Sequence, residues 1–260
     1  MFIILKQTGY SHRSNFLFTA VLAFFMVLSS SLARAAVEDA IDRPAEVSRL
    51  GPYSVLLSAA RAGESIIAVG ERGFILLSDD NAKTWKQLPS PVSSTLTGVA
   101  FSNEKVGYAI GHGGTVLGTK DGGKNWALLV NGLTLVEALL TDALLKKDEE
   151  AAETARFLLD DGPDKPFLDL LLLSSEHIVV VGAYGLAFES KDAGKTWHSW
   201  MSRIDNPFGL HLYSIRKQGN RVLIAGEQGF VALSNDNGDS FETIETPYEG
   251  SFFTAQLPDA

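Results

Sequence analysis

The amino-acid sequence predicts an all-β protein, a β-propeller of four-stranded blades that carries one α-helical insertion. An octet of the pattern Ser/Thr-x-Asp-x-Gly-x-Thr-Trp recurs four times along the 260 residues. Its aspartates are 41, 71 and 44 residues apart, and a step of about 42 residues is typical of one propeller blade. Two short apolar runs joined by Gly-x-x-Gly precede each octet, so both observations indicate the same repeat. The octets are Ser78–Trp85, Thr119–Trp126, Ser190–Trp197 and Ser234–Phe241.

Each repeat supplies four short strands. In the first repeat, the runs Ile66–Gly70 and Gly73–Ser78 predict two strands joined by a tight hairpin, where glycine supplies backbone angles that other residues resist. The apolar run Tyr53–Leu57 precedes this pair, and Trp85 opens a fourth strand. Four strands in about 42 residues match one blade. The predicted blades lie near residues 52–90, 95–130, 167–205 and 211–246 of a propeller spanning residues 36–260.

The carboxyl end of the sequence bears on how the ring closes. Residues 251–260 are similar to the first strand of another blade, but no fifth octet follows them. Propellers close their ring because an open arc exposes strand edges. We therefore expect these residues to be part of a ring of six or seven blades that is a monomer when full length. A closed ring of four blades is the alternative.

The long step between the second and third octets contains the insertion, residues 131–165. Neither glycine nor proline occurs from Thr134 to Asp160, and leucine, alanine, glutamate and lysine dominate, which predicts helix. The charged cluster Lys146–Glu150 leaves open whether this is one helix or two, with Asp148 as an N-cap of the second. An apolar stripe is expected to pack on the propeller or on a partner; it includes Leu133, Val136, Leu140 and Leu144.

The octet resembles the Asp-box, also called the BNR repeat. The resemblance implies a hairpin between the third and fourth strands, in which the aspartate accepts hydrogen bonds from loop N–H groups and the aromatic residue packs between blades. We predict that these residues are structural: Asp80, Trp85, Asp121, Trp126, Asp192, Trp197, Asp236 and Phe241. Glu189 stands where a phosphate-binding loop ending in Gly194-Lys195-Thr196 would need glycine. A calcium loop is the weaker reading of the octets, and we predict neither a metal nor a cofactor.

Strand order places the octets at one end of every blade and the Gly-x-x-Gly turns, together with the insertion, at the other end. We call this second end the turn face. Its turn residues differ from blade to blade on a repeated backbone, which predicts a surface for recognition. The alternative is that exposed turns are polar only because water surrounds them. The predicted partner-binding residues are Glu71, Arg72, His112, Tyr184, Glu227 and Gln228.

The amino terminus and the composition limit the location and the partners. Residues 1–35 contain Lys6 and Arg13, then the apolar run Phe16–Leu28 and an Ala-x-Ala site ending at Ala35, which predicts a cleaved signal peptide. An uncleaved anchor is the alternative.

The sequence has no cysteine, which excludes disulfides and thiol chemistry. The formal net charge is −9, and loss of a leader with three basic residues would make it more negative, so we expect no nucleic-acid partner.

The repeats behind a signal peptide resemble the photosystem II stability/assembly factor-like family over about residues 50–260. The motifs that carry this resemblance are Val-Gly-x-x-Gly-x-Ile and, after it, Ser-x-Asp-x-Gly-x-Thr-Trp. The resemblance implies an exported, non-catalytic propeller that binds a protein component of a membrane complex during its assembly and is peripheral to the membrane at most. It would be lumenal in thylakoids of photosynthetic cells and periplasmic in other bacteria. The helical insertion departs from the family's repeat and suggests an envelope complex other than a photosystem.

An Asp-box glycoside hydrolase of the sialidase type is the alternative function. Such an enzyme needs an arginine triad for the substrate carboxylate, a tyrosine nucleophile and an acidic partner. Only Arg72 falls at a turn of the turn face, and the Phe/Tyr-Arg-Ile-Pro motif is absent. The four histidines beyond the leader, residues 112, 177, 198 and 211, show no helical metal-ligand spacing. We therefore predict no catalytic residues.

Overall fold

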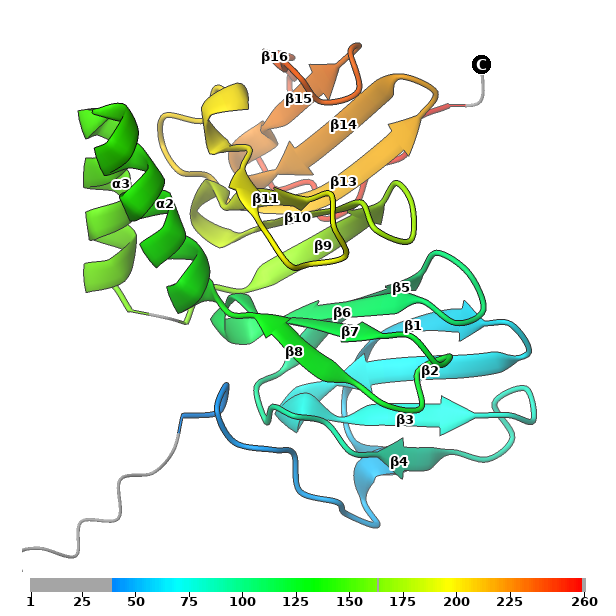
Figure 1. Cartoon of the computed structure of the whole chain (residues 1–260). Helices are drawn as coiled ribbons and strands as arrows, with labels where there is room; N and C mark the ends of the chain where they lie inside the picture. Colours follow the sequence, from blue (N-terminus) through cyan, green and yellow to red (C-terminus); the bar gives the residue numbers. More distant parts are fainter. Residues whose placement is uncertain (1–38, 163, 259–260) are drawn as a thin grey trace, which may run out of the picture. The chain divides into compact units, whose positions relative to one another are not determined.

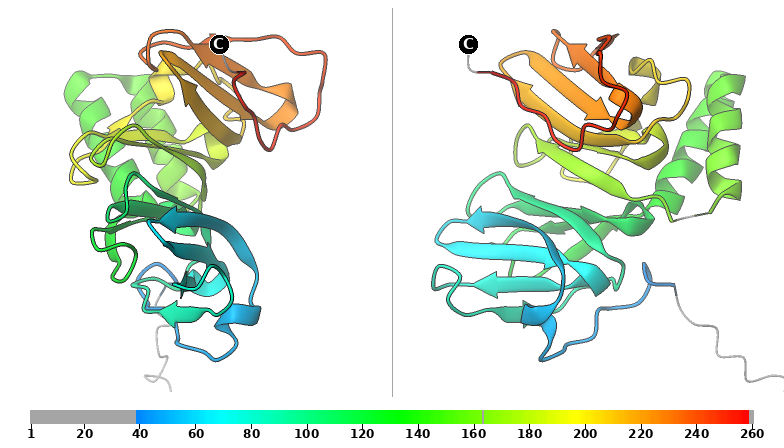
Figure 2. Two further views of the ribbon diagram at one scale, coloured as in Figure 1. Left: turned by 90° about the vertical axis from the view of Figure 1, so that its right-hand side faces the viewer. Right: turned by 180° about the vertical axis from the view of Figure 1, so that it is seen from behind.

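Four antiparallel sheets of four strands follow one another along the chain in the computed structural model (Figure 1). The structure describes residues 39–162 and 164–258, so the predicted leader lies outside the described residues. Within each sheet every strand pairs with its neighbours in sequence, and the first strands of successive sheets lie beside one another (Figures 1 and 2). This arrangement is that of propeller blades, so the predicted fold class is confirmed.

The blades have the following strands. Blade one contains β1 (Leu56–Ala62), β2 (Ser65–Gly70), β3 (Ile75–Ser78) and β4 (Lys86–Leu88). Blade two contains β5 (Leu96–Phe101), β6 (Gly107–Gly111), β7 (Val116–Thr119) and β8 (Ala127–Val130). Blade three contains β9 (Phe167–Leu172), β10 (Ile178–Gly182), β11 (Ala187–Ser190) and β12 (His198–Ser199). Blade four contains β13 (Leu212–Gln218), β14 (Arg221–Gly226), β15 (Val231–Ser234) and β16 (Glu242–Thr243).

The two glycines of each Gly-x-x-Gly turn are needed for different reasons. Gly182 is extended, with φ −167°, but a Cβ there would lie 2.2 Å from the carbonyl oxygen of Pro166. Gly185 has φ +70° and follows Tyr184 at φ 57°, which makes these two residues the centre of a type I′ turn. The expectation that glycine supplies unusual backbone angles therefore holds for the second glycine only. The first is needed for close approach of two backbone segments.

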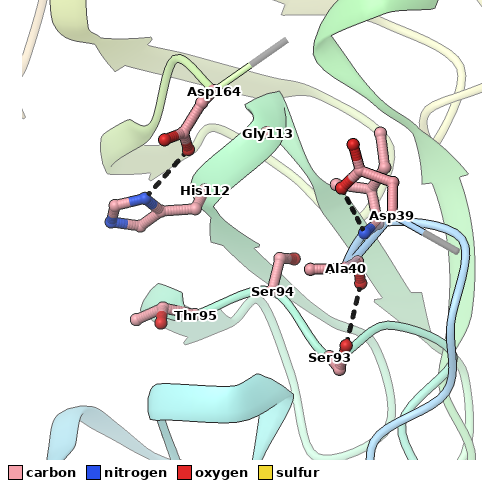
Figure 3. Close-up of a pocket in the computed structure, with 9 residues that line it drawn as sticks. Asp39, Ala40, Ser93, Ser94, Thr95, His112, Gly113 and Asp164 are labelled. Carbon is pink, nitrogen blue, oxygen red and sulfur yellow. Dashed lines mark hydrogen bonds and ion pairs between the residues drawn. The ribbon is translucent and has the colours of Figure 1, made fainter. Parts of the chain in front are cut away.

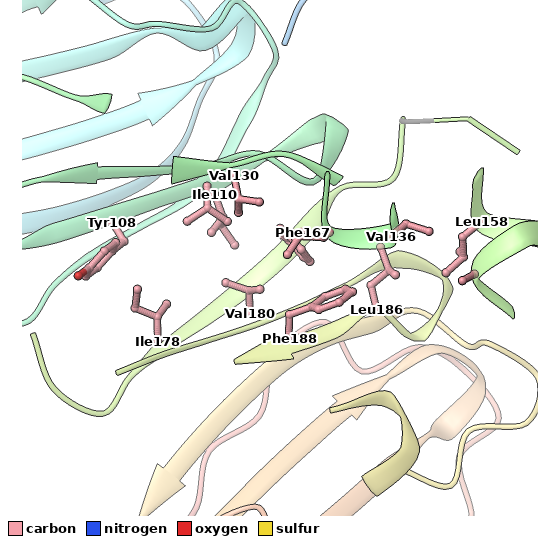
Figure 4. Packing of buried hydrophobic residues seen from close by; sticks show 13 residues of the cluster. Tyr108, Ile110, Val130, Val136, Leu158, Phe167, Ile178, Val180, Leu186 and Phe188 are labelled. Atoms are coloured by element: carbon pink, nitrogen blue, oxygen red, sulfur yellow. The ribbon is translucent and has the colours of Figure 1, made fainter. Parts of the chain in front are cut away.

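Apolar side chains fill the layers between neighbouring blades. The layer between blades two and three contains Ile110, Phe167 and Val180, all fully buried (Figure 4). Similar clusters lie between blades one and two and between blades three and four. Each fully buried aliphatic side chain stabilises such a layer by about 1.5 to 3 kcal/mol.

Hydrogen bonds between first strands set the register of successive blades. The backbone N–H of Val99 donates to Ser58 Oγ (3.2 Å), that of Ile215 to Asp169 Oδ2 (2.9 Å) and that of Ala255 to Ser214 Oγ (3.3 Å). The third bond places the segment after β16 where the first strand of a following blade would lie. At the other end, Leu56 of β1 is 37% exposed, whereas its counterparts Leu96 and Leu212 are fully buried. The expected number of blades stays a prediction.

The insertion consists of two antiparallel helices, α2 (Gly132–Lys146) and α3 (Glu149–Asp160), at the turn-face end (Figure 1). Lys147 has φ 58° and ends α2, and the Asp148 carboxylate accepts a hydrogen bond from the N–H of Ala151 at the start of α3. Val136 and Leu158 join the apolar layer between blades two and three (Figure 4).

The apolar stripe of the insertion packs on the propeller only in part. Val136 is buried and Leu140 packs against the layer between blades two and three, but Leu133 and Leu144 are exposed. The expected packing on the propeller is therefore found for Val136 and Leu140, and packing of Leu133 and Leu144 on a partner stays a prediction. Among residues 39–162 and 164–258, no helix is long and apolar enough to cross a membrane.

The aspartate of each octet organises its loop. Asp121 Oδ1 accepts the backbone N–H groups of Lys124 (3.1 Å) and Asn125 (3.0 Å), and Oδ2 accepts Asn125 Nδ2 (2.7 Å). The bond from the Asn125 side chain and these backbone bonds hold the pKa of Asp121 below its usual value. The same pattern lowers the pKa of Asp80 and of Asp192 to about 2, chiefly through the side chains of Thr84 and Thr196.

The aromatic residue of the octet packs between blades. The Trp126 indole N–H donates to the carbonyl of Gly123 (2.8 Å), and its ring meets Phe101 edge-on at 6.1 Å in the layer between blades one and two. In the fourth octet, the Phe241 ring lies 5.9 Å from that of Trp200. An aromatic ring of either type therefore fills this position.

Replacement of Asp121 by alanine is expected to reduce the free energy of unfolding by about 1 kcal/mol, because four hydrogen-bond donors lose a charged acceptor in a loop that is open to water. Thermal unfolding would measure the change, and partner binding should persist once the fold is intact. The matched control is Asp142→Asn, on the exposed face of α2. A variant of Asp121 that keeps its stability but loses partner binding would show that the octet belongs to the binding surface.

Candidate functional site

Four turns with one backbone geometry and different side chains make up the turn face. They are η2 (Glu71–Gly73), η3 (His112–Gly114), η4 (Ala183–Gly185) and η6 (Glu227–Gly229), and their central residues are Arg72, Gly113, Tyr184 and Gln228. All four have positive φ. Non-glycine residues seldom adopt this conformation, so three of the four blades hold a side chain outward at a small conformational cost.

Two of the predicted partner-binding residues are bonded inside their own blade. Glu71 Oε1 accepts the backbone N–H of Val55 (3.2 Å), and Glu227 Oε2 accepts that of His211 (3.2 Å). Each carboxylate thus fixes the chain just before the first strand of its blade. These bonds give Glu71 and Glu227 a structural role, and their role in partner binding stays a prediction.

A cavity of about 420 Å³ opens beside η3 (Figure 3). His112 lies at its edge, with Nδ1 3.4 Å from Oδ1 of Asp164, in the segment that follows α3. The opposite wall is formed by residues 39–41, where the Asp39 carboxylate accepts the N–H of Ile41 (3.4 Å). The remaining wall is the loop before β5, which contributes Ser93, Ser94 and Thr95. The cavity therefore presents two carboxylates, one imidazole and three hydroxyl groups.

Four aromatic side chains form a row across blades three and four, which we call the aromatic ladder. It consists of Tyr184, His211, Tyr213 and Phe253, with successive ring centroids 5.3, 6.2 and 4.9 Å apart. Phe253 is 72% exposed, and the other three rings are partly exposed. The backbone N–H of Tyr184 donates to Nδ1 of His211 (3.1 Å), so Nδ1 carries no hydrogen and Nε2 is left as the donor of the neutral ring.

Lys165 connects the cavity to the aromatic ladder. Its buried ammonium donates to the carbonyls of Leu158 (3.1 Å) and Gly162 (2.6 Å), and it lies 5.3 Å from the ring centroid of Tyr184. The preceding residue, Asp164, lines the cavity. Asp164 and Lys165, which are neighbours in sequence, therefore border the two features.

The structure brings together some of the predicted residues and not others. Tyr184 and Glu227 meet at His211, and His112 lines the cavity. Arg72 and Gln228 are exposed on blades one and four, away from these contacts. Sequence reasoning missed several members of the cavity and the ladder because they stand outside the repeated motifs: Asp39, Asp164, Lys165, His211, Tyr213 and Phe253.

Among the described residues, no group of three or more histidine, cysteine, aspartate or glutamate side chains is arranged to hold a metal ion. The chemistry that the turn face does offer is hydrogen bonding, negative charge and aromatic contact. Together with the fold, this defines an Asp-box propeller whose turn face carries a cavity and a row of aromatic rings.

Comparison with known proteins identifies the family. The family model described as photosynthesis system II assembly factor YCF48 matches residues 77–138 and 157–249. The chain therefore belongs to this family, and the resemblance inferred from the repeats is confirmed. Residues 139–156, between the two matched segments, comprise the second half of α2, the turn after it and most of α3, so the middle of the insertion departs from the family pattern.

Individual relatives agree with this assignment. Photosystem II assembly protein Ycf48 of Synechococcus sp. (strain JA-3-3Ab) is 26% identical over 200 residues, 69% of this chain and 54% of the relative. The solved structure of YCF48 bound to D1 peptide has a TM-score of 0.51 at 15% identity, over 73% of this chain and 54% of that one. YCF48 from Cyanidioschyzon merolae has a TM-score of 0.52 at 16% identity, over 75% and 58%. The chain spans about half the length of these relatives.

Proposed function

We propose that this protein assists the assembly or stability of a membrane protein complex by binding one of its protein subunits, without catalysing a reaction. Membership of the YCF48 family supports this role, as does a relative solved with a bound D1 peptide. The observation that carries the proposal is the aromatic ladder beside an acidic cavity, because exposed aromatic rings next to polar groups are typical of protein recognition surfaces.

The location of the protein is part of the same proposal. Export is supported by the predicted signal peptide, residues 1–35, and would place the propeller in the periplasm, or in the thylakoid lumen of a photosynthetic cell. From there it would meet exposed segments of membrane subunits and remain peripheral to the membrane. Fractionation of source cells should recover it in the soluble exported fraction, shortened at its amino terminus.

Cross-linking would test the proposed function. The tagged full chain is added to solubilised membranes of its source organism, and captured proteins are identified by mass spectrometry. A photoreactive amino acid placed at Arg72 or at Gln228 on the turn face is expected to cross-link to one subunit of a membrane complex. The same photoreactive amino acid placed at Lys124 or Lys195 of the Asp-box loops is the matched control, because these residues lie at the opposite end of the blades.

Two results would contradict the proposal. Cross-links confined to the Asp-box loops would show that the turn face is not the recognition surface. Hydrolysis of a sialylated oligosaccharide by the purified chain would favour the glycoside hydrolase instead.

A further inference from the structure

We propose that the cavity and the aromatic ladder form one site for an extended peptide segment that places a basic side chain in the cavity and apolar side chains on the ladder. The inference rests on the proposed function and specifies the chemistry of the partner segment. It follows from the negative charge of the cavity, from the spacing of the rings along the ladder, and from the neighbouring residues Asp164 and Lys165, which border the cavity and the ladder.

The charge of the cavity favours a cation. Asp39 and Asp164 both line the cavity. The Asp164 side chain is 88% exposed, and its Oδ1 lies 3.4 Å from Nδ1 of His112. None of the nine lining residues is lysine or arginine. Arg43 does not line the cavity, but its Nε donates to Oγ of the lining residue Ser93 (3.3 Å). A lysine or arginine side chain entering the cavity would thus donate charge-assisted hydrogen bonds to the two carboxylates and donate to neighbouring hydroxyl oxygens.

The spacing of the aromatic ladder suits an extended backbone. Successive ring centroids are 4.9 to 6.2 Å apart, and side chains on one face of an extended peptide recur about every 6.6 Å. Alternate residues of such a segment can therefore pack on successive rings. The Nε2–H group of His211, set by the bond from Tyr184 to Nδ1, supplies a donor for a peptide carbonyl.

The two halves meet at two residues that are neighbours in sequence, Asp164 and Lys165. Asp164 faces the cavity while the buried Lys165 next to it contacts the Tyr184 ring. Three polar partners fix the Lys165 ammonium: the carbonyls of Leu158 and Gly162 and the carboxylate of Asp161 at 3.0 Å. A site ordered in this way loses less conformational entropy on binding. The acidic chain, with formal net charge −9, also favours encounter with a basic segment.

Selection from a phage-displayed library of random octapeptides tests the inference. On the wild-type chain we expect enrichment of one lysine or arginine and of aromatic or large aliphatic residues at alternate positions. Asp164→Asn should remove the enrichment of the basic residue only. Tyr213→Ala and Phe253→Ala should remove the apolar enrichment only. The matched controls, Asp142→Asn on α2 and Phe157→Ala on α3, should select like the wild type.

Fluorescence anisotropy with a selected peptide then measures how far binding depends on the contact between Asp164 and the basic residue of the peptide. We expect Asp164→Asn to weaken binding about tenfold, and Phe253→Ala about fivefold. With the basic residue of the peptide replaced by norleucine, Asp164→Asn should have no effect. An unfolding midpoint equal to that of the wild type confirms that a variant is folded. If Tyr213→Ala does not fold, Phe253→Ala alone tests the aromatic ladder.

Four outcomes would overturn the inference. Three concern the library: selection of acidic peptides, the absence of any enrichment, and unchanged selection by Asp164→Asn and Phe253→Ala. The fourth is binding of cello- or xylo-oligosaccharides that Phe253→Ala abolishes, because it would assign the ladder to carbohydrate.

The inference and the proposed function can fail separately. Capture of a membrane subunit equally well by the wild type, Asp164→Asn and Phe253→Ala would end the inference and leave the function standing. Peptide selection as expected, without capture of any membrane subunit, would end the function and leave the site.

Discussion

Replacement of Gly182 by alanine is expected to lower the free energy of unfolding by about 3 kcal/mol. The added Cβ would lie 2.2 Å from the carbonyl oxygen of Pro166 and 2.9 Å from Cα of Phe167, and both are backbone atoms that no side-chain rotation can move. The same carbonyl accepts the N–H of Ala183 (3.0 Å), so relief of the clash also breaks this bond. Phe167 is fully buried between blades two and three, which leaves the strand little room to shift.

Thermal unfolding measures this loss, with an expected decrease in Tm of about 6 to 12 °C for a folded unit of this size. The matched control is Gly219→Ala, because Gly219 has φ +59° but a Cβ there would meet nothing within 4 Å. It should cost about 1 kcal/mol, from conformation alone. Equal losses in the two variants would show that close approach of the backbone is not what selects the first glycine of the turn.

Most of the propeller could be predicted from the sequence because the repeat is local. The octet and the Gly-x-x-Gly turn each specify their own hairpin, and strand parity then fixes which end of the blade each occupies. Asp121 illustrates this, since its acceptor bonds all lie within four residues of it. The break in the insertion could be located at Lys146–Glu150 but not decided, because both one helix and two satisfy the same helical propensities.

The cavity and the ladder could not be predicted, because their members come from different blades and from connections that do not repeat. Tyr184 was identified from its turn, but its contact with His211 depends on the packing of blade four against blade three. Asp164 follows the insertion and Asp39 precedes the first blade. Their approach to the same cavity is a property of the folded chain, with no sequence signal at either position.

At Glu189 the sequence departs from its own repeat, and this departure has a structural consequence. The corresponding residues of blades one and four are Leu77 and Leu233, by the pairing of each third strand with the second. The Glu189 side chain is only 4% exposed, yet His177 Nε2 lies 2.7 Å from Oε1 and Lys191 Nζ 3.3 Å from Oε2. Burial raises the pKa of Glu189, but these partners outweigh it, and the resulting pKa is below the ordinary value.

This cluster joins blade three to blade four through Arg203. One guanidinium nitrogen lies 3.8 Å from Glu189 Oε2, and another donates to the carbonyl of Gly238 (3.1 Å) in the fourth octet. The guanidinium carbon is also 5.0 Å from the centre of the Trp200 ring, so the cation packs on an aromatic face between the blades. Removal of the glutamate charge would leave Arg203 there without its counter-ion.

Glu189→Gln is therefore expected to lower the free energy of unfolding by about 2 kcal/mol at pH 7. The loss is smaller than for a fully buried pair because Lys191 is 62% exposed and can turn to water. A folded-state pKa below the unfolded value of about 4.5 means that the stabilisation is complete above that pH. It is lost as the pH falls through the folded-state pKa. The difference between wild type and Glu189→Gln should therefore shrink as the pH falls below about 4.5.

Urea unfolding at a series of pH values measures this difference, and the acid response of the octet aspartates cancels because both proteins contain them. Lys191→Gln is the matched control, and it should change stability by less than about 1 kcal/mol at pH 7, as expected for an exposed partner. A difference between wild type and Glu189→Gln that stays constant as the pH falls below about 4.5 would show that hydrogen bonding or shape, and not the charge of Glu189, joins the two blades.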